Sequence, residues 1–335
     1  MGATIRDVAL AAGVSTATVS RALRGLSNVN ATTRDRIVGI ARDMDFSVSR
    51  SASRLATGRT GTIGIITPYV GRWYFTEVFA GVEEGLKPYD VDLLLHTTEP
   101  SEASPVPEAH VRMRRRVDGV LVMGIEADRE EIKALAELNV PVVLLGAQTP
   151  GAASVSIDDR LGSRSAVQHL GERGHERIGL ITGRRLPTRF LPENDRLAGY
   201  LDVMADYGLA ADPDLREIGL FTTRGGERAM RTLLGLTDRP TAVFCMSDEM
   251  AFGALRAMRQ QGVVAGGDIA AGEIAVIGFD GHDLAEAFDL STVSQPVRAL
   301  GRAAAGMLMA RIAGTAHPRV TIMPTELVPR GSTGC

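Results

Sequence analysis

The sequence predicts a small all-α domain followed by a larger α/β body built on parallel sheets. Two short helical patterns separated by one glycine occupy the first 25 residues, and from residue 62 onward short β-branched runs alternate with amphipathic stretches. Such alternation is typical of parallel sheets covered on both faces by helices. The chain has 335 residues, 44% of them hydrophobic and 23% charged, so two or three globular units are expected.

The first predicted helix begins after Thr4. A threonine at this position can cap a helix, and Asp7 places a carboxylate where the positive end of the helix dipole favours it. Gly13 supplies the tight turn at the other end. The residues that recur at helical spacing and share one apolar face are Ile5, Val8, Ala9 and Ala12.

The second predicted helix begins after Ser15, which can cap it, and buries Val19 and Leu23. A helix that lies in the DNA major groove needs short polar side chains near its N-terminus and a guanidinium group that can read guanine. We therefore expect a DNA-reading helix, although a solvated helical hairpin shows part of the same pattern. The outward residues have these properties: Thr16, Ala17, Ser20 and Arg21.

A third helix is predicted after Asn30, and Phe46 completes its small core. Residues 47–60 are rich in serine and arginine, with Leu55 as the one large apolar side chain. This composition fits a flexible linker, and residues 50–56 also fit about two helical turns, too short to be stable alone. The buried face of the third helix is expected to be Ile37, Ile40, Ala41 and Met44.

Charge is divided unevenly along the chain. Nine arginines and four aspartates give residues 1–60 a formal charge of +5, so the rest of a chain with net charge −3 carries −8. A basic head on an acidic body is the electrostatic pattern of a DNA-binding module attached to another function. With no apolar run long enough to span a bilayer and no signal-peptide pattern, a cytoplasmic protein without membrane contact is expected.

The body contains seven short β-branched runs that are the predicted strands. Pro100, Pro105 and Pro107 interrupt the element between the second and third of them, so a short or irregular helix is expected there. The predicted strands are residues 62–67, 91–95, 119–123, 140–145, 178–182, 242–245 and 275–279. The predicted helices are residues 75–86, 130–138, 161–170, 195–207, 225–234, 248–260 and 297–312.

Polar side chains that directly follow strands are candidates for a binding site, because ligands bind at the carboxyl ends of parallel strands. Asp280 follows one run, Ser247 and Asp248 follow another, and Arg196 lies at a predicted helix start. A carboxylate and a guanidinium together suit vicinal hydroxyls, and an aromatic ring such as Phe221 suits the apolar face of a sugar. Each residue also has a structural interpretation as a helix cap, a salt bridge or a core position.

Enzyme chemistry is not indicated. No complete GxGxxG motif after a strand, no GxxxxGK[ST] motif and no GxSxG motif occurs. The two cysteines, Cys245 and Cys335, have no metal-ligand spacing. We therefore expect no catalytic residues, no cofactor and no metal.

The N-terminal motif resembles that of the lactose-repressor (LacI/GalR) family of bacterial transcriptional regulators. The resemblance implies a helix-turn-helix domain at 1–46, a hinge at 47–60 that becomes helical on the operator, and an effector-binding and dimerisation core at 61–335. The core is implied to be periplasmic-binding-protein-like, with two doubly wound parallel-sheet subdomains at 61–160 with 294–323 and at 161–293 with 324–335. The matching residues are Thr4-Ile5, Asp7-Val8-Ala9, Ala12-Gly13-Val14-Ser15, Thr18-Val19-Ser20-Arg21 and Thr33-Arg34.

The resemblance also implies site residues. In the family, the leucine that matches Leu55 wedges into the minor groove. The implied DNA contacts are Thr4, Ser15, Thr16, Ala17, Thr18, Ser20, Arg21, Asn28, Ala52 and Leu55. The implied effector contacts are Tyr74, Phe75, Arg196, Phe221, Ser247, Asp248, Asp280 and Gln295. The positions that depart from the family pattern are Arg24 and Ser247, each in place of a common asparagine, and Phe46, Val48 and Ser49, in place of Tyr-x-Pro-Asn.

The implied function is a repressor that binds a palindromic operator as a homodimer and responds to a small-molecule effector, a sugar or sugar derivative. Two other functions share some of these features. One is a regulator that answers mainly to a protein co-repressor or a non-sugar ligand, and the other is a cytosolic solute-binding protein. The resemblance leaves open whether the effector releases DNA or strengthens its binding.

Overall fold

The computed structural model describes residues 3–23, 28–46, 59–98, 111–124, 129–184 and 191–334. The chain forms two compact units, Met1–Gly61 and Thr62–Cys335. The hinge residues Ala52 and Leu55, named above as implied DNA contacts, lie outside the described residues. The same is true of other positions named above: Arg24, Val48, Ser49, Pro100, Pro105, Pro107 and Cys335.

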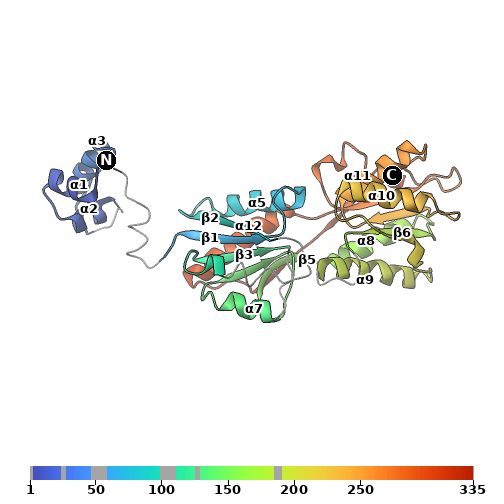
Figure 1. Ribbon diagram of the computed structural model, residues 1–335, viewed down its shortest axis with the longest axis horizontal. Helices are drawn as coiled ribbons and strands as arrows, with labels where there is room; N and C mark the ends of the chain where they lie inside the picture. The colour runs from blue at the N-terminus through green and yellow to red at the C-terminus, as the bar shows by residue number, and fades with distance from the viewer. Residues whose placement is uncertain are drawn as a thin grey trace. The chain divides into compact units, whose positions relative to one another are not determined.

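The described part of the N-terminal unit contains three helices, α1 (Ile5–Ala12), α2 (Thr16–Leu23) and α3 (Ala31–Asp43) (Figure 1). Gly13 takes the left-handed conformation between α1 and α2 (φ 63°), which a residue without a Cβ adopts at little cost. Asn30 caps α3 by accepting the Thr33 N–H at 2.8 Å. The buried core is Val8, Ala9, Ala12, Val19, Ala22, Val29, Ile37 and Ala41. Ala22 thus takes the central place expected for Leu23, which packs at the edge of this core.

The body contains two six-stranded sheets, each in its own subdomain. Subdomain 1 has the strand order β11-β5-β4-β3-β1-β2, all parallel. Its strands are β1 (Thr62–Thr67), β2 (Asp92–Thr97), β3 (Gly119–Met123), β4 (Val142–Leu145), β5 (Ala153–Ile157) and β11 (Val320–Met323). Subdomain 2 has the order β12-β10-β9-β8-β6-β7, with β12 antiparallel to β10 and the other pairs parallel. Its strands are β6 (Ile178–Thr182), β7 (Arg216–Ile218), β8 (Ala242–Cys245), β9 (Ala275–Asp280), β10 (Ser291–Ser294) and β12 (Glu326–Val328).

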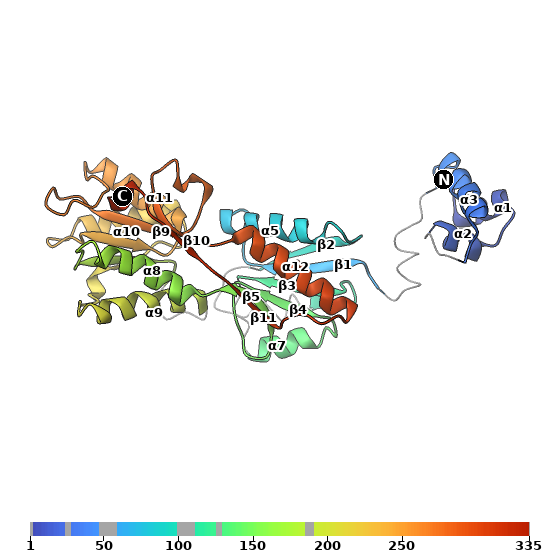
Figure 2. The same cartoon turned by 180° about the vertical axis from the view of Figure 1, so that it is seen from behind.

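Helices cover both faces of each sheet (Figures 1 and 2). In subdomain 1, α5 (Trp73–Leu86) packs beside α12 (Val297–Ala313) on one face, and α7 (Arg129–Ala136) lies on the other. The α5–α12 contact is close because Gly81 lies against the backbone of Arg298, where any Cβ would collide with a carbonyl oxygen. In subdomain 2 the paired helices are α8 (Asp159–Gly171) with α9 (Leu191–Asp206), and α10 (Thr223–Leu234) with α11 (Asp248–Gln260).

Along its described residues, the chain passes between the two subdomains three times. The first crossing joins β5 to α8, the second joins β10 to α12, and the third joins β11 to β12. Three short 3-10 turns complete the described elements: η1 (Pro213–Leu215), η2 (Asp283–Ala285) and η3 (Gly331–Thr333). Within the described ranges, none of the helices combines the length and apolar character needed to cross a bilayer.

Candidate functional site

The outward face of α2 carries the residues implied to read DNA. Thr16, Ala17 and Arg21 are exposed, whereas Val19 and Ala22 are buried against the rest of the small core. An exposed arginine one turn beyond two short side chains has the reach and the paired donors to contact a guanine edge in the major groove. This face is therefore the candidate nucleic-acid interface of the N-terminal unit.

Side chains at both helix starts fix the geometry of this unit. Ser15 Oγ accepts the Thr18 N–H at 3.1 Å and so caps α2. At the start of α1, Asp7 Oδ2 accepts both the Thr4 N–H (2.8 Å) and the Thr4 hydroxyl (2.7 Å), and these bonds lower the pKa of Asp7. Thr4 and Asp7 thus form the capping box expected at the start of α1, and the Thr4 hydroxyl also donates to the carboxylate. The other implied contacts in the described part are partly buried or exposed: Thr18, Ser20 and Asn28.

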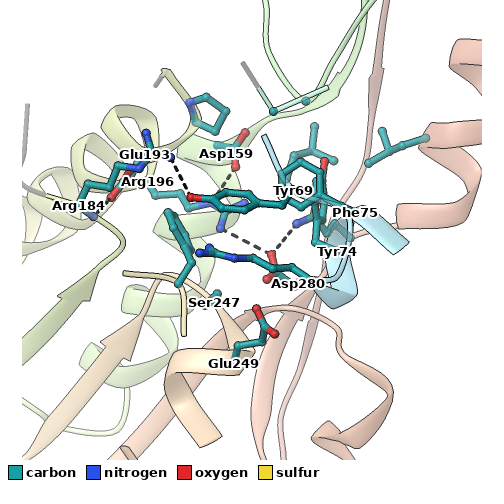
Figure 3. Close-up of a pocket in the computed structure, with 18 residues that line it drawn as sticks. Tyr69, Tyr74, Phe75, Asp159, Arg184, Glu193, Arg196, Ser247, Glu249 and Asp280 are labelled. Atoms are coloured by element: carbon teal, nitrogen blue, oxygen red, sulfur yellow. Dashed lines mark hydrogen bonds and ion pairs between the residues drawn. The ribbon is translucent and has the colours of Figure 1, made fainter. Parts of the chain in front are cut away.

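A pocket lies between the two subdomains of the body (Figure 3). It has about 810 Å³ of atom-free space, part of it open to solvent. Seven of the eight implied effector residues line it: Tyr74, Phe75, Arg196, Phe221, Ser247, Asp280 and Gln295. Asp248 is not among the lining residues.

Arg196 is the central cation of the pocket. Its Nε donates to Asp159 Oδ1 at 2.8 Å, its Nη1 donates to the Met246 carbonyl at 2.5 Å, and Nη1 lies 3.6 Å from Asp280 Oδ1. The guanidinium also stacks 3.8 Å above the ring of Phe279. Burial lowers the pKa of Arg196, but Asp159 and Asp280 outweigh it and raise the pKa above the usual value. The guanidinium is thus held rigidly in one orientation.

Asp280 ends β9 at the floor of the pocket. It has φ 122°, a conformation that side-chain-bearing residues rarely adopt and that often marks functional positions. Gln295 Nε2 donates to its Oδ1 at 2.7 Å. Burial raises the pKa of Asp280 to about 7, although Arg196 and Gln295 favour the ionised form.

Asp159 and Tyr74 line the pocket from opposite subdomains. Asp159 is the first residue of α8, and burial raises its pKa to about 6 while Arg196 lowers it. Tyr74 lies on the first turn of α5, and burial raises the pKa of its hydroxyl, so the phenol is protonated. A Cβ placed on Gly146 would lie 3.0 Å from the Tyr74 oxygen, so the hydroxyl would have to shift by a few tenths of an ångström.

The aromatic lining comes from both subdomains. Tyr74 and Phe75 pack edge to face with ring centroids 5.3 Å apart, and Phe75 lies against Gly124. Both rings line the pocket, so the pair combines lining with packing. On the other side, Phe221 has a positive φ of 52° and packs against Gly183, which leaves no space for a Cβ. These rings offer apolar faces to a ligand held by Arg196.

Ser247 and Asp248 follow the same strand and have different surroundings. Ser247 lines the pocket and caps α11, with Oγ accepting the Met250 N–H at 3.3 Å. Asp248 is fully buried behind it, where Oδ1 accepts the Thr292 hydroxyl (2.7 Å) and Oδ2 accepts the His282 N–H (2.7 Å). We therefore correct its implied role: Asp248 anchors the loop after Asp280 rather than facing the pocket.

Several lining residues were not singled out in the sequence. Asp159, Tyr69 and Arg184 each lie one or two residues beyond the end of a strand, so the rule that selected Asp280 also finds them once β5, β1 and β6 are considered. Arg184 Nη2 lies 3.5 Å from the Tyr69 hydroxyl and so joins the two subdomains. The remaining charged lining residues are Arg72, Glu193 and Glu249.

The charges of the pocket nearly balance. Glu193, Arg184 and Arg196 lie together on one side of it, and Glu249 lies on another (Figure 3). A site with no excess of positive charge does not favour a phosphate or another free anion, whereas its many donors and acceptors suit an uncharged ligand with several hydroxyls. The carboxylates are Asp159, Glu193, Glu249 and Asp280, and the guanidinium groups are Arg72, Arg184 and Arg196.

Comparisons with known proteins agree with this architecture. Residues 4–49 match the family described as bacterial regulatory proteins, lacI family, and residues 167–333 match the periplasmic binding protein-like domain. The chain is 33% identical to the HTH-type transcriptional repressor CytR of Escherichia coli (strain K12), over 99% of this chain and 96% of that protein. The expected fold class, a helix-turn-helix unit and a two-subdomain periplasmic-binding-protein-like core, is confirmed.

Two solved structures are similar over nearly the whole chain. The lac repressor dimer bound to operator and the anti-inducer ONPF has a TM-score of 0.89 at 26% identity and covers 100% of both chains. The complex of the transcriptional regulator CelR with cellobiose has a TM-score of 0.70 at 29% identity, covering 98% of this chain and 99% of that one.

Proposed function

We propose that this chain, which belongs to the lacI family of bacterial regulatory proteins and is a DNA-binding transcriptional repressor of that family, is controlled by a small molecule. The proposed effector is a sugar or sugar derivative that binds in the pocket and changes operator binding. The observation that carries this proposal is the convergence of Arg196 and Asp280 in a pocket lined by aromatic rings. A guanidinium and a carboxylate fixed side by side bind vicinal hydroxyls, and the rings cover the C–H face of a sugar. The similar CelR structure holds cellobiose.

We further propose that the protein binds a palindromic operator as a homodimer. Each protomer would place α2 in the major groove of one half-site, with Arg21 on a guanine and with Thr16 and Ala17 selecting neighbouring bases. The hinges, including Leu55, would meet at the operator centre. The similar lac repressor structure is a dimer bound to operator, which supports this arrangement.

An operator-binding titration with a panel of sugars tests the effector proposal. At least one neutral mono- or disaccharide should change operator affinity of the native protein. Arg196→Ala and Asp280→Asn should still bind operator but should lose the response, because the hydroxyl-binding pair is broken. Arg160→Ala is a matched control, since Arg160 pairs with Asp202 on the exposed side of α8 and α9, away from the pocket.

The outcomes separate clearly. A response lost in both pocket variants and kept in the Arg160 variant supports a sugar effector in this pocket. If the two pocket variants respond as the native protein does, the effector binds elsewhere. If no sugar changes operator binding of the native protein, the proposal of a sugar effector is wrong.

A further inference from the structure

Glu193 presents an unused acceptor at the pocket wall. It lies in the first turn of α9, three residues before Arg196 and therefore on the same helical face, and only 1% of its surface is exposed. Its Oε1 accepts the Arg184 N–H at 2.5 Å. Its Oε2 is buried from solvent and has no hydrogen-bond partner among the residues that the structure describes. Sequence reasoning did not select this residue.

An unpaired carboxylate oxygen in such a place favours a ligand that brings a donor. Removing a charged acceptor from water without giving it a donor is costly, and that cost is recovered when a ligand N–H or O–H occupies the position. The carboxylate torsion of glutamate is broad, so a small rotation can turn Oε2 toward an incoming group. Glu193 lines the same pocket as Asp280, on another side of it (Figure 3).

The surrounding charges select the kind of donor. The pKa of Glu193 is raised by burial, and it is lowered by the backbone N–H groups of Arg184 and Gly183 and by the charges of Arg184 and Arg196. Two guanidinium groups thus already offset the negative charge of this carboxylate. A ligand ammonium group would meet both of them at close range, whereas a hydroxyl brings the missing hydrogen bond without added charge.

We propose that Glu193 is a specificity-determining effector contact that accepts a hydrogen bond from one hydroxyl of an uncharged sugar. This inference rests on the proposed function, because it places a second recognition point in the same pocket. Arg196 and Asp280 would hold one pair of hydroxyls, and Glu193 would read a further hydroxyl from a different side. The site would therefore discriminate between sugars that differ only at that position.

A deoxy-sugar scan tests this assignment. The full-length protein is titrated by calorimetry with ribose, glucose, galactose, maltose and cellobiose, and then with the monodeoxy analogues of the sugar that binds best. One analogue should bind the native protein roughly 10- to 100-fold more weakly, as expected for loss of a hydrogen bond to a charged group. The sole tryptophan, Trp73, stacks on His282 with ring centroids 4.6 Å apart and gives an independent fluorescence signal.

Two variants at position 193 and one control complete the design. Glu193→Gln keeps an oxygen for the Arg184 N–H and removes the charge, and Glu193→Ala removes the acceptor altogether. Both should bind the parent sugar more weakly and should no longer discriminate against that one analogue. Asp195→Asn removes a carboxylate from the same helical turn outside the pocket and should behave as the native protein. Thermal melting of each variant checks that it is folded.

Each result decides between assignments. For each analogue, the affinity relative to the parent sugar is compared between the native protein and the two variants at position 193. If this ratio is the same in all three proteins for every analogue, Glu193 does not contact the ligand and the inference is wrong, while a sugar effector stands. If glucosamine binds the native protein more tightly than glucose and this preference disappears in Glu193→Gln, the donor is an ammonium group and the hydroxyl assignment is wrong. If no sugar binds the native protein, the proposed effector class fails and the inference fails with it.

Discussion

Replacing Arg196 by methionine would remove the cation that lies between two buried carboxylates. In the native protein Arg196 Nε is 2.8 Å from Asp159 Oδ1, and Nη1 is 3.6 Å from Asp280 Oδ1. Methionine keeps much of the side-chain volume, so the principal change is electrostatic. Removing one partner of a buried ion pair typically costs about 3–5 kcal/mol, because the remaining charge is left uncompensated. We expect Arg196→Met to lower the free energy of unfolding of the body by about this amount at pH 8.

The loss of unfolding free energy in Arg196→Met should become smaller as the pH falls. Burial raises the pKa of Asp159 to about 6 and that of Asp280 to about 7, while Arg196 lowers both. Both values lie above the unfolded value, so the folded protein binds these protons more tightly and gains stability as the pH falls through this range. Without Arg196 the two pKa values rise further. Stability relative to the native protein should therefore recover between pH 8 and pH 5.5, where neutral carboxyl groups need no cation.

Urea denaturation at these two pH values, followed by circular dichroism, measures the effect. Arg164→Met is the matched control, because Arg164 also bridges two aspartates, Asp202 (3.5 Å) and Asp206 (2.8 Å), on the exposed side of α8 and α9. Exposed ion pairs contribute little to the free energy of unfolding. The Arg164→Met control should therefore lose much less stability and show no comparable recovery at low pH. Equal losses in the two variants, or a loss in Arg196→Met that does not change with pH, would refute the role assigned to Arg196.

Three further predictions concern DNA. Arg21→Ala should weaken operator binding by roughly 1–3 kcal/mol per half-site and should relax the base preference at one position in a selection from randomised operators. Equal weakening of binding to all sequences would instead identify Arg21 as a phosphate contact. Leu55→Ala should weaken specific binding and abolish operator bending, measured by electrophoretic mobility, without changing the helicity of the N-terminal unit. Unchanged bending would contradict the insertion of Leu55 into the minor groove. The effector should change operator affinity by roughly five- to 150-fold, and operator should change effector affinity by the same factor in calorimetry; unequal factors would contradict a two-state coupling.

Much of the fold could be predicted because local pattern and burial agree. The runs at 62–67, 119–123 and 178–182 are fully or almost fully buried strands, and their β-branched composition reflects burial on both faces. Five strands were not among the predicted runs, namely β5, β7, β10, β11 and β12, and two of them show a physical reason. In β5, Ser154 and Ser156 interrupt the apolar pattern although both are buried, and β11 is an edge strand with alternating exposure. Short strands of this kind are defined by their partners in the sheet rather than by their own residues.

The candidate site was predictable to the extent that it follows from strand ends. Asp280 and Ser247 follow from the rule that polar groups gather at the carboxyl ends of parallel strands, and both line the pocket. The rule does not resolve adjacent residues, so Ser247 and Asp248 were both selected although only Ser247 faces the pocket. Glu193 lies on a helix, and the groups around its carboxylate come from other segments of the chain. Only the folded chain therefore shows that Oε2 of Glu193 has no hydrogen-bond partner among the described residues.

The residues that hold the pocket together are also those through which the subdomains are joined. Asp159 begins α8 immediately after the first crossing, and Gln295 lies in the second crossing between β10 and α12. Gln295 donates to Asp280, and Asp159 accepts from Arg196, so both crossings connect to the two groups proposed to grip the effector. A ligand can shift a conformational equilibrium only through contacts that differ between the two states. We propose that a change in the angle between the subdomains acts on both crossings and reaches Arg196 and Asp280 through Asp159 and Gln295. On this proposal, the hydrogen bonds that orient these side chains for a ligand also make its binding sensitive to the arrangement of the subdomains.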